Sequence, residues 1–463
     1  MIALPLAHAL GAREDLPIPD WLFAWGAAVV LIVSFVAFSL AWHRARLESD
    51  GWRPVAPSLS RIVVNPVTEV LAGLVGVFLL GVVVWSGLNG TDDPTRNFAV
   101  TFVFVTVWLG MVALSLVFGD VFRAFNPWRA IARASGGVFR LVAGQPAPTP
   151  LTLPDRVGRW PAVVALAGFV WFYLVYGQAG FGAAGLDPHA VAVATLVYTA
   201  YTLAGMALFG VDRWLERGEM LSAYFGMFAR IAPVEVRDGR LGLRRPLSGL
   251  SGWAVMPGSV ALVLLAIGAT TFDGAREGAI QGQITSVFDW MVDGGVGPLS
   301  ALRLTNTLFL VAVIAFVAGL FWAGLAGMHS VEGSPPTKRL GRLFAHAFVP
   351  IALGYLVAHY FSFLIFQGQA QFTYLLSDPL GDGSDLLGTA SAGIDYTLIG
   401  THGIWYVMVG SLVAGHVVAL AVAHDRAIDV YGDSQLAARS QYWMLALMVG
   451  FTSLGLFLLS QGN

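Results

Sequence analysis

The side chains most able to do chemistry in this sequence are histidines in its last third. His359 lies in a long apolar segment, with Tyr355 one turn before it and Ser362 just under one turn after it. His402 lies at the start of the next apolar segment, and His416 lies well inside that segment. Imidazole binds metal ions and transfers protons near neutral pH. Because ionisable groups are costly within an apolar helix, these histidines are the first candidates for a functional site.

Acidic residues accompany the histidines in the segment 368–403. This segment has no Lys or Arg and carries Asp378, Asp382, Asp385 and Asp395. Imidazole together with carboxylate suits zinc or manganese, and such a cation lowers the pKa of a bound water. We therefore expect His359 to lie close to His402 and Asp395. The candidate catalytic residues are His359, His402, Asp395 and Tyr355, and the candidate metal ligands are His359, His402 and His416.

The composition shows where such a site must lie. Of the 463 residues, 57% are hydrophobic and only 12% are charged, about half the charged share of an average soluble protein. A soluble globular enzyme is excluded, because this chain cannot cover a water-facing surface. The absence of cysteine excludes disulfides, thiolate metal sites and covalently attached haem. The net charge of −2 leaves no cationic field for nucleic acid.

The apolar residues fall into ten segments, each about as long as a membrane-spanning helix. They are residues 21–41, 67–88, 98–118, 161–178, 190–210, 253–271, 305–328, 344–367, 404–423 and 442–460. The sequence thus predicts an all-α integral membrane bundle within one polytopic domain. All but four of the 26 Lys and Arg residues lie in alternate loops, the exceptions being Arg13, Arg96, Arg276 and Arg303. The positive-inside rule then places both termini outside the plasma membrane.

The same topology assigns four segments that connect or flank the helices. Residues 1–20 form an external arm, and residues 368–403 form an external acidic loop. Residues 119–160 are cytoplasmic and include an interfacial amphipathic helix over 120–142. Residues 211–250 are also cytoplasmic, with a hairpin predicted over 233–246 around Asp238-Gly239.

Two other classes of function fit some of these residues. The spacings of His346 to His359 and of His402 to His416 are those of histidine pairs that bind b-type haem. However, the expected depths of His359 and His416 differ by about 10 Å at 1.5 Å per residue, which disfavours a shared haem. A transporter is the second alternative, because Pro350 and many glycines are typical of the broken helices that form substrate sites.

Several stretches carry a resemblance to a known family. "RIAPVEVRDGRLGLRRPLSGL", "PIALGYLVAHYFSFLIFQGQ" and "SDPLGDGSDLLGTA" resemble an actinobacterial family of multi-span membrane proteins commonly called fenitrothion hydrolase. The resemblance covers essentially the whole chain. It implies hydrolysis of a lipophilic phosphorothioate triester but assigns no catalytic residues. Together with the residues, it favours an outward-facing His/Asp site for metal-assisted ester hydrolysis, ahead of a transporter or a haem-bearing redox subunit.

Overall fold

A computed structural model describes residues 20–144, 150–178 and 186–461 of the chain. Apart from three short strands, the regular structure in this part is helical, which confirms the predicted all-α class. Among these described residues, seven helices are long and apolar enough to cross a membrane, by length and composition: Pro57–Asn89, Phe98–Phe118, Pro188–Phe209, Ser259–Arg276, Pro298–His329, Thr337–Ser377 and Thr401–Tyr431. The protein is therefore a multi-pass helical membrane protein. The predicted external arm lies outside the described residues, except for Asp20.

Each of the ten predicted apolar segments contains helix. The helices are α1 (Asp20–Ala41), α3 (Pro66–Asn89), α4 (Phe98–Thr101) continued by the π-helix η1 (Phe102–Gly110) and α5 (Met111–Phe118), α8 (Trp160–Leu174), α9 (Pro188–Phe209), α13 (Ser259–Arg276), α15 (Pro298–His329), α17 (Val349–Phe372), α19 (Thr401–Tyr431) and α21 (Tyr442–Gln461). Short helices join them: α2 (Pro57–Val63), α10 (Val211–Arg217), α12 (Ser248–Ser251), α16 (Thr337–Phe344), α18 (Tyr374–Ser377) and α20 (Ser434–Ser440).

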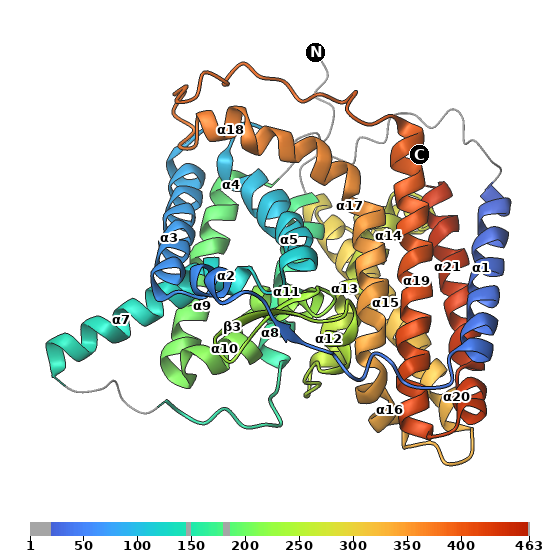
Figure 1. The fold of residues 1–463 in the computed structure, drawn as a ribbon. Helices are drawn as coiled ribbons and strands as arrows, with labels where there is room; N and C mark the ends of the chain where they lie inside the picture. The colour runs from blue at the N-terminus through green and yellow to red at the C-terminus, as the bar shows by residue number, and fades with distance from the viewer. Residues whose placement is uncertain (1–19, 145–149, 179–185, 462–463) are drawn as a thin grey trace.

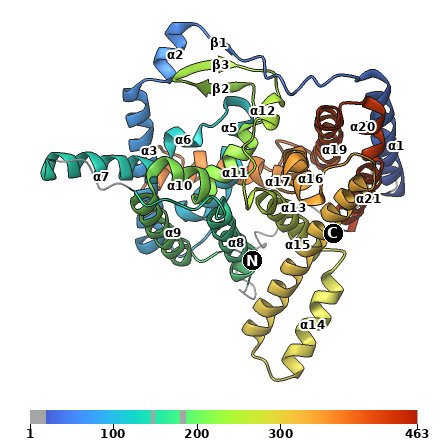
Figure 2. The same ribbon diagram turned by 90° about the horizontal axis from the view of Figure 1, so that it is seen from below.

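The bundle has two groups of helices with two central helices between them (Figures 1 and 2). One group contains α3, η1, α8 and α9, and the other contains α1, α15, α19 and α21. Between them, α13 packs on α8, α15 and α17, while α17 packs on η1 and α19. Groups carried by α13 and α17 therefore lie where the two halves of the molecule meet.

Side chains at the helix starts explain where several helices begin. Asn65 accepts a hydrogen bond from the Val67 amide at the start of α3, and Asn97 does the same for Ala99 at the start of α4. Asp187 accepts from the amides of His189 and Ala190 at the start of α9. These side chains satisfy amides that have no partner within the helix.

Glycine allows α17 and α19 to approach closely. A Cβ atom on Gly354 would lie 2.7 Å from the Ser411 carbonyl oxygen, and one on Gly415 would lie 2.7 Å from the Pro350 carbonyl oxygen. Both distances are too short for a real contact. Small residues at such crossings let two backbones pack directly on each other. This contact holds α17 in place.

The predicted hairpin is confirmed and is joined by a third strand. β2 (Val234–Arg237) pairs antiparallel with β3 (Arg240–Leu243), and Asp238 and Gly239 both have positive φ, as a type I′ turn requires. β1 (Arg53–Pro54) pairs with the other edge of β3. Asp50, just before β1, forms an ion pair of 2.5 Å with Arg237. The hydrogen bond from Arg237 lowers the pKa of Asp50, so this carboxylate remains charged and fastens the sheet.

The segment predicted as one interfacial helix is helical but divided. α6 (Phe122–Phe125) ends at Phe125, and α7 (Pro127–Ala143) begins at Pro127. Asn126 lies between them, and its side chain accepts a hydrogen bond from the Arg129 amide. The first turn of α7 is buried, including Trp128. The last turns of α7 extend away from the bundle (Figure 1) and expose apolar side chains such as Leu141. The prediction of a single helix over 120–142 was therefore wrong, because Pro127 fits the first turn of a helix better than its interior.

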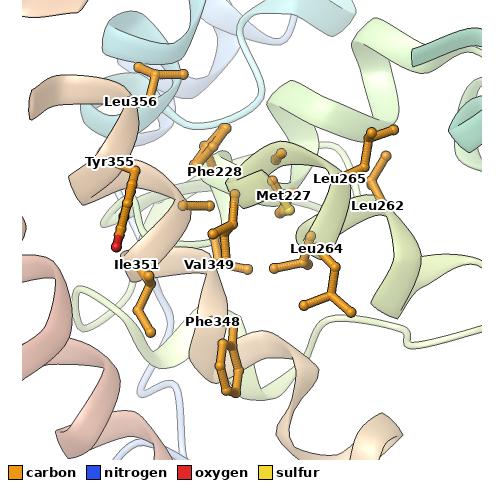
Figure 3. Close-up of a cluster of buried hydrophobic side chains, with 14 of the residues drawn as sticks. Met227, Phe228, Leu262, Leu264, Leu265, Phe348, Val349, Ile351, Tyr355 and Leu356 are labelled. Carbon is orange, nitrogen blue, oxygen red and sulfur yellow. The ribbon is translucent and has the colours of Figure 1, made fainter. Parts of the chain in front are cut away.

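The segment 211–250 is not confined to the surface. Its helix α11 (Met220–Ala229) enters the core, where Phe225, Met227 and Phe228 are fully buried. Figure 3 shows Met227 and Phe228 beside side chains of α13 and α17, among them Leu264 and Val349. From the sequence, this ten-residue stretch was expected to belong to a loop, because it is too short to cross a membrane.

A further helix, α14 (Gln281–Asp293), lies in the loop between α13 and α15 and was not predicted. It pairs with the beginning of α15, and this hairpin extends from the body of the molecule (Figure 2). None of the α14 residues is buried, and the Trp290 side chain is 72% exposed.

Candidate functional site

The main polar site inside the bundle is centred on Asp273, near the end of α13. Its side chain is fully buried. Oδ2 accepts a hydrogen bond from Tyr360, at 2.6 Å, and lies 2.9 Å from His359 Nε2, while Oδ1 forms a 2.7 Å ion pair with Arg276 Nη2. We call these four residues, Asp273, Arg276, His359 and Tyr360, the Asp273 cluster.

Local sequence places the cluster on two helices. Asp273 and Arg276 are three residues apart on α13, so their side chains meet on one face of that helix. His359 and Tyr360 are neighbours on α17, which packs on α13. Arg276 Nη1 also donates to the Leu174 carbonyl at the end of α8, at 3.0 Å. Three helices are thus tied together at this point.

The arrangement has a defined acid–base chemistry. A carboxylate that receives the Nε2 proton of His359 fixes the imidazole tautomer, so the lone pair lies on Nδ1. The same carboxylate stabilises the imidazolium that forms when Nδ1 takes a proton. Arg276 compensates the buried negative charge of Asp273, which otherwise would be too costly in this apolar surrounding. The site can therefore take up a proton at Nδ1 beside a carboxylate that contacts both cationic side chains, which gives the protonated cluster a net charge of about +1.

Two of the predicted residues, Tyr355 and His416, lie together elsewhere in the bundle. Their rings are 6.0 Å apart between centroids, and the Tyr355 hydroxyl donates to the Phe451 carbonyl of α21 at 3.3 Å. His416 Nδ1 lies 2.9 Å from the Leu412 carbonyl oxygen. The cavity that His416 lines has about 20 Å³, which suits a single water rather than a porphyrin.

The two other predicted residues are exposed: Asp395 lies in the loop that precedes α19, and His402 lies in the first turn of α19. Asp395 accepts from the Thr397 amide at 2.8 Å, and its own amide donates to Gln369. Hydrogen bonds from Thr397 lower the pKa of Asp395. Gln369 is ten residues after His359, about 15 Å along the helix. Asp273, rather than Asp395, is the carboxylate that His359 contacts.

These positions do not assemble the predicted metal centre. Among the described residues, no group of three or more His, Asp or Glu side chains is placed to hold a metal ion. The donor set around Asp273 also fits a zinc or manganese ion poorly, because the guanidinium of Arg276 already occupies Oδ1 and would repel a second cation. His359, His402 and His416 are not brought together here as ligands.

Sequence reasoning missed three of the four cluster residues. Asp273 and Arg276 follow directly after the predicted span 253–271, so they were grouped with the loop, although α13 continues to Arg276. Tyr360 was not predicted because helical spacing favoured Tyr355, which lies four residues from His359. An Asp and an Arg three residues apart at the end of an apolar segment were the available signal.

A second buried carboxylate, Glu219, has a structural explanation. It is fully buried at the start of α11, where it accepts from the amides of Leu221 and Ser222. Asn126 and the hydroxyl of Tyr198 also donate to it. Four donors satisfy both oxygens, so we assign Glu219 to capping α11.

The fold and the Asp273 cluster together define a class: a helical membrane protein with a buried, ion-paired Asp/His/Tyr/Arg cluster inside its bundle. A scan against protein-family models and searches among curated proteins and solved structures found no match. The function must therefore be inferred from the geometry of the chain's own residues.

Proposed function

We propose that this protein hydrolyses a lipophilic ester by acid–base catalysis at the Asp273 cluster. The observation that carries the proposal is the 2.9 Å contact of His359 Nε2 with the buried Asp273 carboxylate inside an apolar bundle. A lipophilic ester partitions into the bilayer and reaches such a site without passing through water. Ester hydrolysis is also what the family resemblance of the sequence implies.

Each cluster residue has a role in this reaction. His359 Nδ1 takes a proton from a water molecule as the water oxygen attacks the ester centre. The bond to the leaving alcohol or phenol then breaks, and the imidazolium returns its proton to the leaving oxygen. Asp273 orients the ring and stabilises the imidazolium, as the carboxylate does in hydrolytic triads. Arg276 and Tyr360 hold Asp273 in place.

The test is a single substitution with a matched control. The assay uses purified full-length protein in nanodiscs and a phosphorothioate triester with a nitrophenolate leaving group. We expect His359→Gln to hydrolyse this triester at least about 100-fold more slowly than the wild type, which is the usual scale of general-base catalysis. His43→Gln, at an exposed histidine, should retain the wild-type rate. Hydrolysis by a folded His359→Gln protein at the wild-type rate would refute the proposal.

Transport is the second candidate, favoured by one observation. The cluster lies where α13 meets α17, between the two groups of helices, and proton transfer there is suited to driving a movement of one group against the other. Two results together would support this second candidate. The protein would not hydrolyse the triester, and it would transport the triester across liposome membranes at a rate that depends on a pH gradient and on His359.

We also propose that ten helices cross the membrane and that both termini face outward. The basic loops of the sequence support this topology. In Figure 1, α1 begins and α21 ends at the side of the 378–400 segment, while α16 and α20 lie at the opposite side. The outward face would then carry Asp395 and His402.

Cysteine labelling tests this topology, because the native chain contains no cysteine. Ser391→Cys lies in the exposed acidic loop and Arg240→Cys lies at the exposed end of β3. We expect a membrane-impermeant maleimide to label Ser391→Cys in intact cells and Arg240→Cys only after lysis. The reverse pattern would invert the topology, and labelling of both in intact cells would overturn the helix count.

A further inference from the structure

A large apolar cavity lies in the half of the bundle that contains α3, η1, α8 and α9. Its volume is about 600 Å³, within the range of small-molecule sites. It extends from Val191, in the first turn of α9, to Met220 at the start of α11. None of the described residues that line it is charged, and the hydroxyl groups among them belong to Thr195, Tyr198 and Tyr201.

The cavity opens sideways between α8 and α9. Val164 of α8 and Val197 of α9 both line it and are 68% and 65% exposed, so the cavity is not closed over at these two helices. Trp171, one turn from the end of α8, is 37% exposed at the same opening. α9 is long and apolar enough to cross a membrane and α8 is a shorter apolar helix, so an opening between them faces hydrocarbon when the bundle lies in a bilayer. A molecule dissolved in the bilayer can enter without meeting water.

The polar groups in the wall already have partners. The Tyr198 hydroxyl donates to Glu219, and the Tyr201 hydroxyl contacts the carbonyls of Pro161 and Gly218. Thr195 donates to the Val191 carbonyl within its own helix. An ionic ligand would find no counter-charge here, so it would lose its hydration without compensation. The lining selects a neutral, lipophilic molecule.

An aromatic pair separates this cavity from the Asp273 cluster. Trp108 of η1 and Phe169 of α8 line the cavity, and their rings lie 4.6 Å apart between centroids. The same two residues also line a second cavity of about 20 Å³, whose opposite wall includes Tyr360. That volume holds about one water. Tyr360 in turn donates to Asp273.

We propose that the large cavity binds a neutral lipophilic molecule that enters from the bilayer, with its reactive end against the Trp108–Phe169 pair. The small cavity behind the pair has room for a single water beside Tyr360, the cluster residue that lines it. The proposal of a binding site is supported by the residues that line the cavity alone. The proposal that the substrate binds there rests on the function proposed above. Both a free lipophilic molecule and a lipid acyl chain could supply the apolar group that fills this cavity. We assign the site to the free lipophilic molecule, because none of the described residues at the opening carries a charge to bind a lipid headgroup.

Photolabelling of full-length protein in nanodiscs tests the binding site. One probe is a neutral aryl diazirine, and the other is a phosphatidylcholine with a diazirine in its acyl chain. We expect the neutral probe to label the peptide around Trp108 and Phe169 saturably, with excess unlabelled neutral aryl compound competing. The lipid probe should label only the exposed faces of α8 and α9, without saturation.

Gly168 supplies the decisive variant. It lines the cavity, and a Cβ atom there meets nothing within 4 Å, so Gly168→Leu fills the site without a backbone clash. The neutral probe should then bind about tenfold or more weakly, equal to at least about 1.4 kcal/mol. Gly319→Leu, at an equally open glycine of α15 outside the cavity, should bind as the wild type does.

Three outcomes would overturn the proposal. They are unsaturable labelling of the wild type, unchanged labelling in Gly168→Leu, and saturable labelling of the same peptide by the lipid probe, which would make a membrane lipid the occupant. Competition in the wild type tests the binding site even if Gly168→Leu does not fold. If the neutral probe binds but His359→Gln still hydrolyses the triester, the binding site stands and the proposed reaction fails.

Discussion

Asp273→Asn will give a protein that is both poorly stable and inactive. The substitution removes the charge that compensates Arg276, whose side chain is only 11% exposed. Breaking a buried ion pair from one side costs about 3–5 kcal/mol, because the remaining charge stays buried without a partner. We therefore expect a large fall in the midpoint of thermal unfolding in detergent. Hydrolysis should be lost as well, since His359 loses the carboxylate that orients it.

A double variant separates the two effects. Asp273→Asn combined with Arg276→Met removes both charges, and such neutral replacements of buried pairs are often close to wild type in stability. We expect the unfolding midpoint to recover while hydrolysis remains absent. Asp155→Asn is the matched surface control, because Asp155 pairs with Arg217 but is 94% exposed, and such pairs contribute about 1 kcal/mol or less. A double variant with wild-type hydrolysis would show that the cluster is only structural.

Gly415→Ala should destabilise the protein because there is no room for a methyl group at this helix crossing. The new Cβ atom would lie 2.7 Å from the Pro350 carbonyl oxygen and 3.1 Å from the Gly354 Cα atom, both of which are backbone atoms of α17. The two helices must move apart, at a cost of about 1–3 kcal/mol for overpacking. Because α17 carries His359, we expect slower hydrolysis together with a lower unfolding midpoint.

The control for this effect lies on the same helix. Gly410 is also in α19, and a Cβ atom there meets nothing within 4 Å. Gly410→Ala should be neutral or stabilising by up to about 1 kcal/mol, because alanine loses less backbone entropy in a helix. Equal stability of the two variants in the same unfolding assay would contradict the close crossing of α17 and α19.

The sequence predicted the long helices well because their signal is strong. About twenty consecutive apolar residues can only form helix in hydrocarbon, where every backbone group needs a partner within its own segment. Asp238-Gly239 predicted the hairpin equally well, since few residue pairs adopt positive φ twice in succession. Short elements such as α11 and α14 were missed, because ten or so residues carry no comparable length signal.

The site was harder to predict than the helices. His359 was chosen because a histidine in an apolar helix is conspicuous, and the structure places it in the Asp273 cluster. Its partner could not be chosen, because α13 and α17 are far apart in the sequence and the rotation of each helix depends on packing. Asp395 was favoured for its place in an acidic loop, yet its side chain is engaged by Thr397. The cavity had no sequence signal, because its lining is the same as any apolar core.

The π-helical winding of η1 has a mechanical consequence for the aromatic pair. Each π turn holds about one residue more than an α turn, so rewinding one turn to α-helix would advance the following residues by one position. One position is a rotation of about 100° and a rise of about 1.5 Å. Trp108 lies near the end of η1, so rewinding an earlier turn would apply this whole rotation and rise to Trp108. The π-helical winding of η1 therefore fixes the position of the Trp108 indole between the two cavities.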